Sequence, residues 1–245
     1  MDSINLLGVN ITATNYKDLL HILIKSPSSG YATLNSVHGI IEAQKSKLVQ
    51  NCINESTYAL CDGRPLFWIL KKKSNQTIDH ITGRVLMLEI CRQAELNGLS
   101  IGIYGGTQIS QASCIQVLKK QFPSLKIDFT YVPDFLLFNQ KEKKEVLEKI
   151  NISKINFLFV CLGCPKQEVW MKNHTNELNC FLLGVGAALD YISGAIKSPP
   201  QIITRMGFEW LFRLLSEPKR LFKRYFFIVP AFIYLMIKEK IKKKI

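Results

Sequence analysis

The sequence predicts an α/β fold: a Rossmann-like, mostly parallel sheet with helices on both faces, followed by a helical C-terminal appendage that is both basic and apolar. Short apolar runs alternate with amphipathic stretches, which is typical of parallel strands connected by helices. One run, F-L-F-V-C at residues 157–161, has the continuous apolar character of a strand covered on both faces. The composition then changes, because residues 196–245 combine many Lys and Arg with large apolar side chains.

The length of 245 residues fits one large domain with an appendage better than two full domains. We therefore expect a domain at residues 1–195 and an appendage at residues 196–245. Asp2 and polar residues stand where a secretory signal would have a basic start and an apolar core, so we expect a cytoplasmic protein. Seven cysteines, an odd number, are typical of reduced thiols, and the one C-x-x-C pair, Cys161 and Cys164, lacks the partners of a zinc site.

Apolar runs, and the residues that end them, locate the strands and helices in chain order. The expected strands are residues 31–35, 58–61, 100–104, 126–131, 157–161 and 180–183. The expected helices are residues 38–47, 65–73, 84–97, 108–122 and 140–150, with a further helix starting after the fifth strand.

Proline and glycine support these boundaries. Pro65 suits the first turn of the helix that it begins, where its missing N–H costs nothing, and Pro165 has the same position after the fifth strand. Gly98 follows a helix where helices commonly end. Gly105 and Gly106 close the third strand, either as a plain turn or as a loop whose N–H groups line a diphosphate.

Polar residues gather where the expected strands end. Parallel strands joined by right-handed crossovers place their carboxyl ends at one edge of the sheet, and ligands of such sheets bind there. A helix N-terminus at this edge favours anionic groups such as phosphates. The candidates at this edge are Thr33, Asn35, Asp62, Gly105, Gly106, Lys166 and Gln167, with Asp190 just beyond the last strand.

Asp62, within C-D-G-R-P at residues 61–65, is the sharpest candidate for chemistry. A carboxylate at a strand end can accept a proton from a hydroxyl group. Turn chemistry alone favours the alternative, in which Asp62 only shapes an Asp-Gly turn. The four histidines are isolated in sequence, so no catalytic triad or metal cluster is indicated. Neither G-x-G-x-x-G nor a P-loop motif is present, which argues against dinucleotide oxidoreductases and P-loop NTPases.

Most of the net charge of +13 lies in the appendage. Residues 196–245 contain twelve Lys or Arg and three Glu, a surplus of +9, which is typical of a surface that contacts nucleic acid or an anionic membrane. Residues 225–237 are uncharged, but they are only thirteen in number and include Pro230, whereas a spanning helix needs about 20 apolar residues. We expect an appendage that lies on the membrane surface. The alternative is a helix packed in the core of a soluble protein.

Several motifs taken together resemble one known family. They are A-T-L-N (32–35), C-D-G-R-P-L-F-W (61–68), I-T-G-R (81–84), Y-G-G (104–106), C-L-G-C-P-K-Q-E-V-W (161–170), G-V-G-A-A-L-D (184–190) and the long basic motif at 207–225. This combination resembles the WecG/TagA/CpsF family of bacterial glycosyltransferases. The resemblance implies inverting transfer of N-acetylmannosamine or a related hexose, without a cofactor or an obligatory metal, from a UDP-sugar to a polyprenyl-diphosphate-linked sugar in cell-envelope polysaccharide synthesis.

The resemblance also implies roles for individual residues. Asp62 would be the base and Thr33 its neighbour in the active site, Gln167 would contact a substrate, and Asp190 would read the uracil base. The appendage would complete the active site with arginines, because a guanidinium suits bidentate binding of a diphosphate. These arginines are Arg213, Arg220 and Arg224. The residues alone favour a solvated or lipid-facing helix surface for these three.

Two departures from the family pattern concern the phosphate contacts. His80 stands where relatives usually have an arginine, and Val85 stands where they have an aspartate. Arg84 is the alternative source of charge there, and Tyr131 is a candidate for stacking on the base.

The expected partners are therefore a UDP-sugar donor, a polyprenyl-diphosphate-linked acceptor and the anionic inner face of the cytoplasmic membrane. Nucleic acid is not expected, and self-association is left open as another way to cover the appendage. The competing class is a non-enzymatic, nucleic-acid-binding α/β protein. It accounts for the basic tail but not for its apolar content, and a methyltransferase is disfavoured because no early glycine-rich cofactor loop is present.

Overall fold

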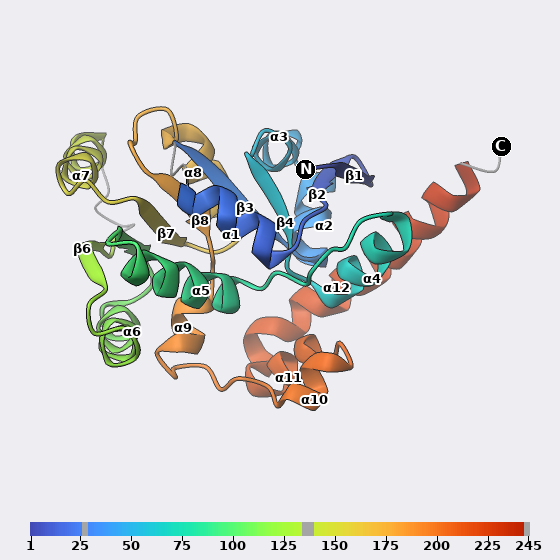
Figure 1. The fold of residues 1–245 in the computed structure, drawn as a ribbon. Coiled ribbons are helices and arrows are strands. Elements are labelled where there is room, and N and C mark those ends of the chain that lie inside the picture. The colour runs from blue at the N-terminus through green and yellow to red at the C-terminus, as the bar shows by residue number, and fades with distance from the viewer. Residues whose placement is uncertain (26–28, 134–139, 243–245) are drawn as a thin grey trace.

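The computed structural model describes residues 1–25, 29–133 and 140–242, apart from the side chains of residues 140–143, 201, 205, 220, 223, 224 and 242. Figure 1 shows a central sheet with helices on both of its faces and a long C-terminal helix that extends beyond the body.

The central sheet has six strands in the order β4-β3-β8-β7-β5-β6, and every neighbouring pair is parallel. The strands are β3 (Gly30–Asn35), β4 (Tyr58–Cys61), β5 (Ser100–Gly105), β6 (Lys126–Tyr131), β7 (Phe157–Cys161) and β8 (Phe181–Gly184). Every residue of β5, β7 and β8 is buried, as expected for strands covered on both faces. The predicted Rossmann-like α/β fold is confirmed.

Nine helices of the described chain precede the appendage and divide between the two faces of the sheet. They are α1 (Tyr16–Lys25), α2 (Val37–Lys45), α3 (Lys47–Asn54), α4 (Arg64–Lys73), α5 (Gly83–Leu96), α6 (Gln108–Gln121), α7 (Gln140–Ile152), α8 (Lys166–His174) and α9 (Ala188–Ile192). Helices α1, α5, α6 and α9 share one apolar core with one face of the sheet. On the other face, α7 and α8 form a second core, while α2, α3 and α4 form a third.

Two local features differ from the elements expected. The single helix expected at residues 38–47 is two helices, because Ser46 leaves the helical conformation and its Oγ caps α3 by accepting a hydrogen bond from the Val49 N–H at 3.4 Å. An antiparallel hairpin, β1 (Ser3–Leu6) and β2 (Val9–Thr12), was not predicted from the sequence. Its apolar side chains are buried in the third core.

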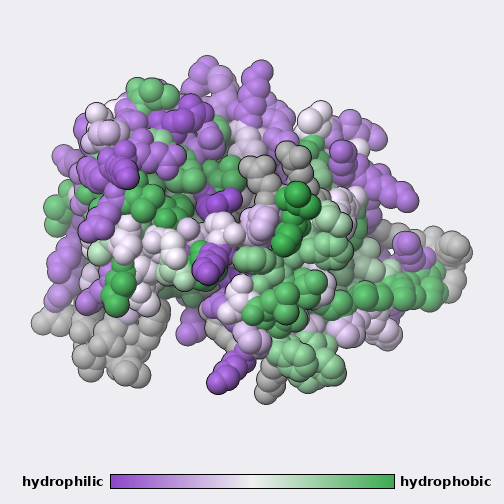
Figure 2. Space-filling model, turned by 90° about the horizontal axis from the view of Figure 1, so that it is seen from below, coloured by the Kyte–Doolittle hydropathy of each residue, from purple (hydrophilic) through white to green (hydrophobic). Residues whose placement is uncertain are grey.

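The appendage consists of α10 (Gln201–Arg205), α11 (Glu209–Ser216) and α12 (Pro218–Lys242), so the expected helical C-terminus is confirmed. One side of α12 packs on the domain, because Ile228 and Phe232 are buried in the third core. The other side carries exposed apolar residues, and Figure 2 shows apolar surface gathered on this part of the molecule. No helix in the described ranges combines the length and the apolar character needed to cross a bilayer.

Candidate active site

The carboxyl edge of the sheet opens into a cleft of about 430 Å³. The loops after β4, β7 and β8 and the start of α5 form it, and α11 of the appendage closes one side. Four of the residues expected from the sequence line this cleft: Asp62, Arg84, Gln167 and Arg213. Other functional side chains that line it are His38, Arg64, His80, Tyr191, Ser198 and Glu209.

Asp62 is held by the backbone around it. Its N–H donates to the Asn35 carbonyl oxygen at 2.9 Å, and its carboxylate accepts a hydrogen bond from the Gly83 N–H at the start of α5. Gly83 is required there, because a Cβ at this position would lie 2.8 Å from the carbonyl oxygen of Val185. The Asp62 carboxylate thereby joins the first residue of α5 to the end of β4.

The electrostatic surroundings of Asp62 make it a suitable general base. Burial, together with the negative charge of Glu209, raises the pKa of this carboxyl to about 7. The Gly83 hydrogen bond and the positive charge of Arg213 act in the opposite direction. A carboxylate with a pKa near neutrality can take a proton from a hydroxyl and still be ionised at physiological pH.

His80 contributes no positive charge to the cleft at neutral pH. Burial, together with the nearby charge of Arg64, lowers the pKa of the imidazole to about 4, although the hydrogen bond to the Asp62 carbonyl acts in the opposite direction. Its Nε2 is bonded to the carbonyl oxygen of Asp62, and because a carbonyl only accepts, Nε2 carries the proton. Arg84, the alternative source of charge, lines the cleft and donates from Nη1 to the Ser198 hydroxyl at 3.0 Å.

Gln167 ties together two loops at the floor of the cleft. Its side chain is buried, its Oε1 accepts from the Gly163 N–H at 3.2 Å, and its Nε2 donates to the Gly184 carbonyl at 3.1 Å. The same Nε2 donates to Oε1 of the buried Glu168 at 3.0 Å. Both amide hydrogens are therefore used, and only a second lone pair on Oε1 remains for a substrate.

Thr33 and Asn35 lie behind the cleft rather than on its surface. Both side chains are buried, and Asn35 Nδ2 donates to Thr33 Oγ1 at 2.9 Å and to the Leu60 carbonyl at 3.3 Å. These bonds join the ends of β3 and β4 directly beneath Asp62. Their position suits a supporting role for the base.

The remaining candidates are not among the residues that line the cleft. Gly105 is the last residue of β5 and Gly106 follows it, with φ of 104° and 77°, and the Gly106 N–H donates to the Cys161 carbonyl at 3.2 Å. Lys166 and Asp190 also lie outside the lining. Tyr131 stacks on Tyr104 with ring centroids 5.9 Å apart, again away from this cleft. The side chains of Arg220 and Arg224 lie outside the described residues.

Sequence reasoning missed several side chains of the cleft, among them Arg64, Tyr191 and Glu209. Arg213 lies 5.5 Å from the centroid of the Tyr191 ring, a cation–π contact between α11 and α9. Glu209 is one helical turn before Arg213, so both reach the cleft from one face of α11. The sequence E-W-L-F-R at residues 209–213 predicts that Glu209 and Arg213 share one face of a helix. It does not predict that this face points toward the cleft.

The family comparison matches nearly the whole chain. Residues 4–245 match the model of the glycosyl transferase WecG/TagA/CpsF family. Among curated relatives, the N-acetylglucosaminyldiphosphoundecaprenol N-acetyl-beta-D-mannosaminyltransferases of Staphylococcus aureus strains MW2 and NCTC 8325 are each 28% identical over 193 residues, which cover 78% of this chain and 73% of theirs. This match argues against the non-enzymatic alternative. The chain belongs to the WecG/TagA/CpsF family of glycosyltransferases.

Proposed function

We propose that this protein is an inverting glycosyltransferase that moves N-acetylmannosamine or a related hexose from a UDP-sugar to a polyprenyl-diphosphate-linked sugar during cell-envelope polysaccharide synthesis. The observation that carries the proposal is Asp62, a carboxylate whose pKa is raised to about 7, in one cleft with Arg84 and Arg213. The relatives are named for transfer of N-acetylmannosamine to a diphosphoundecaprenol-linked N-acetylglucosamine, which supports this class of acceptor.

A single displacement fits this arrangement. The Asp62 carboxylate removes the proton of an acceptor hydroxyl while that oxygen attacks the anomeric carbon of the donor sugar. The bond from the anomeric carbon to the diphosphate oxygen breaks, and UDP leaves from the opposite face, so the configuration inverts. Arg84 and Arg213 stabilise the charge that develops on the leaving diphosphate.

The appendage supplies part of this site and a membrane contact. Glu209 and Arg213 of α11 line the cleft, which supports residues 196–245 as the segment that completes a catalytic domain at residues 1–195. Exposed apolar residues on α12, interspersed with lysines, suit attachment to the anionic inner face of the cytoplasmic membrane, where a lipid-linked acceptor is found. We propose a peripheral, cytoplasmic enzyme.

A donor screen tests the reaction. Purified protein is incubated with each of a panel of UDP-sugars and a short-chain lipid diphosphate that carries N-acetylglucosamine, and released UDP is measured. We expect acceptor-dependent UDP release with UDP-N-acetylmannosamine or a close relative of it. Release of UDP from no member of the panel, by protein that is folded, would refute the proposed function.

A further inference from the structure

Arg64 is a charged group in the cleft to which the mechanism above gives no role. It is the first residue of α4, two positions after Asp62, and its side chain lines the cleft. Its Nε is buried and has no hydrogen-bond partner within the described residues. Buried donors are nearly always hydrogen-bonded in folded proteins, so a buried guanidinium nitrogen without a partner points to an acceptor that comes with a ligand.

Contacts on two sides hold Arg64 in place. The guanidinium carbon lies 5.8 Å from the centroid of the Phe67 ring, one turn along α4. On the appendage side, its Cβ lies against Gly207, where an added Cβ would be 3.4 Å from it. Its charge also contributes to the low pKa of His80. Arg64 therefore stands beside a neutral imidazole, where the domain meets the appendage.

The carboxylates of the cleft do not neutralise Arg64. Asp62 and Glu209 both line the cleft, yet no ion pair within 4 Å joins either of them to Arg64 in the described part of the chain. Arg213 on α11, which also lines the cleft, likewise has a buried Nε without a partner among those residues. Two arginines therefore line one cleft, and the Nε–H of each has no hydrogen-bond acceptor among the described residues.

A diphosphate has the chemistry that satisfies both groups. It carries negative charge and several acceptor oxygens, and guanidinium groups bind such oxygens in bidentate pairs. We infer that Arg64 binds the diphosphate of a substrate in this cleft, which Arg213 also lines. The inference rests on the proposed function, because both the nucleotide donor and the lipid-linked acceptor carry a diphosphate.

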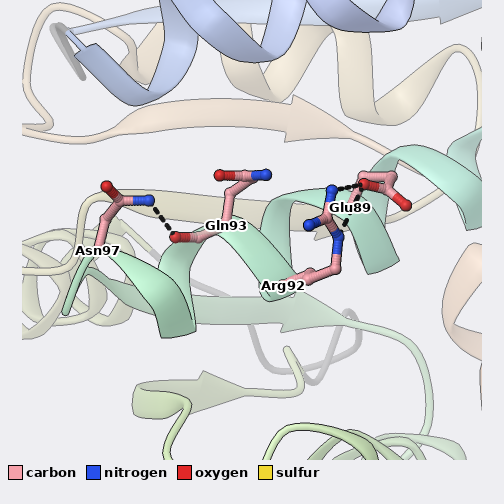
Figure 3. Close-up of polar contacts among 4 residues, drawn as sticks. All are labelled: Glu89, Arg92, Gln93 and Asn97. Atoms are coloured by element: carbon pink, nitrogen blue, oxygen red, sulfur yellow. Dashed lines mark hydrogen bonds and ion pairs between the residues drawn. The ribbon is translucent and has the colours of Figure 1, made fainter.

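Calorimetric titration of the full chain tests this role with three probes: UDP, inorganic pyrophosphate and a short-chain prenyl-diphosphate N-acetylglucosamine. Arg64→Gln removes the charge, and Arg64→Lys keeps the charge but loses the bidentate geometry. The matched control is Arg92→Gln, because Arg92 lies on the outer surface of α5 and, among the residues that the structure describes, is paired only with Glu89 at 2.6 Å (Figure 3).

We expect Arg64→Gln to weaken binding of at least one diphosphate probe by about tenfold or more and to flatten the salt dependence of that binding. Arg64→Lys should fall between wild type and Arg64→Gln, and Arg92→Gln should match the wild type. Weakened binding of UDP assigns Arg64 to the donor, and weakened binding of the lipid probe assigns it to the acceptor. A retained Tm excludes loss of folding as the cause.

The outcomes separate this inference from the proposed function. If the wild type transfers sugar and both Arg64 variants bind all three probes as the wild type does, the role of Arg64 is refuted and the proposed function stands. If the wild type binds diphosphates through Arg64 but transfers no sugar, the proposed function fails and the binding role stands. A wild type that binds none of the probes refutes both.

Discussion

At the scale of single residues, burial and neighbouring charges set the protonation state of each ionisable side chain in the cleft. Asp62 is held at the end of β4 by the Gly83 N–H and is surrounded by groups that raise and lower its pKa. The motif C-D-G-R-P identified Asp62, and the resemblance identified Gln167 and Arg213. The neutral state of His80 and the unpartnered Nε–H of Arg64 could not be predicted from a motif. Both depend on burial and on neighbours that are distant in sequence.

The first prediction concerns Asp62→Asn. Loss of the base should lower kcat by about 10²- to 10⁴-fold, because an amide cannot accept the acceptor's proton. The Kd for UDP should change by less than about threefold, since Asn keeps an oxygen that accepts the Gly83 hydrogen bond. Steady-state kinetics and calorimetry measure the two quantities. Near-normal turnover by a well-folded variant would remove Asp62 from the mechanism.

A second prediction concerns the pH dependence of kcat/KM. The active form of Asp62 is the carboxylate, so activity should rise as pH increases through about 7, the raised pKa of this group. The charge of Glu209 contributes to that rise in pKa, while Arg213 opposes it. Glu209→Gln should therefore lower the pKa and move the acidic limb of the profile to lower pH. The variant would keep a larger fraction of its plateau activity below pH 6.

Glu89→Gln is the control for this profile, because Glu89 is paired with Arg92 on the surface of α5. Its acidic limb should coincide with that of the wild type. An unshifted limb for Glu209→Gln, with the wild-type limb present near pH 7, would show that Glu209 does not tune the base.

At the scale of elements, all six strands of the central sheet were predicted from the sequence. The signal was clearest for β5, β7 and β8, which are buried throughout, because strands covered on both faces are continuously apolar. The hairpin of β1 and β2 escaped prediction, since four-residue strands with alternate polar positions give little signal. The helix break at Ser46 was not predicted either, because the apolar periodicity continues across it. In the structure the break is marked by the hydrogen bond from the Val49 N–H to the Ser46 side chain.

Gly83→Ala is the prediction at this scale. The added methyl group would lie 2.8 Å from the Val185 carbonyl oxygen, so the start of α5 must move away from the loop after β8 and carry the Gly83 N–H away from Asp62. We expect a loss of about 1–3 kcal/mol in the free energy of unfolding and a lower kcat. Thermal denaturation and steady-state kinetics check both.

Gly39→Ala in α2 is the matched control for the helix glycine. A Cβ there would meet its nearest neighbour, the Asn35 side chain, at an ordinary 3.5 Å. Alanine favours a helix over glycine by roughly 0.5–1 kcal/mol, so this variant should keep or raise the Tm. A Gly83→Ala variant that behaves like Gly39→Ala in both Tm and kcat would contradict the proposed coupling of α5 to Asp62.

At the scale of the whole molecule, α12 has two different sides, and this decides how its membrane role is tested. Ile228 and Phe232 are buried in the core that α2 and α4 share. Deleting the end of the chain would remove these core residues along with the exposed ones, so loss of function would follow from unfolding alone. Substitutions on the exposed side separate the two effects.

The last prediction therefore concerns Phe226→Ser combined with Phe227→Ser, two residues that are 63% and 62% exposed on α12. Inserting both rings into a bilayer surface contributes about 1.5–3 kcal/mol each, so the double variant should bind anionic liposomes at least tenfold more weakly. Its Tm and its Kd for UDP should stay close to the wild type, because neither ring is buried in the domain. The control is Ile109→Ser on α6, a position 82% exposed, which should leave liposome binding unchanged.

Undiminished liposome binding by the double variant would refute the membrane role of this surface. Loss of self-association in light scattering, with liposome binding retained, would assign the same surface to contacts between copies of the chain.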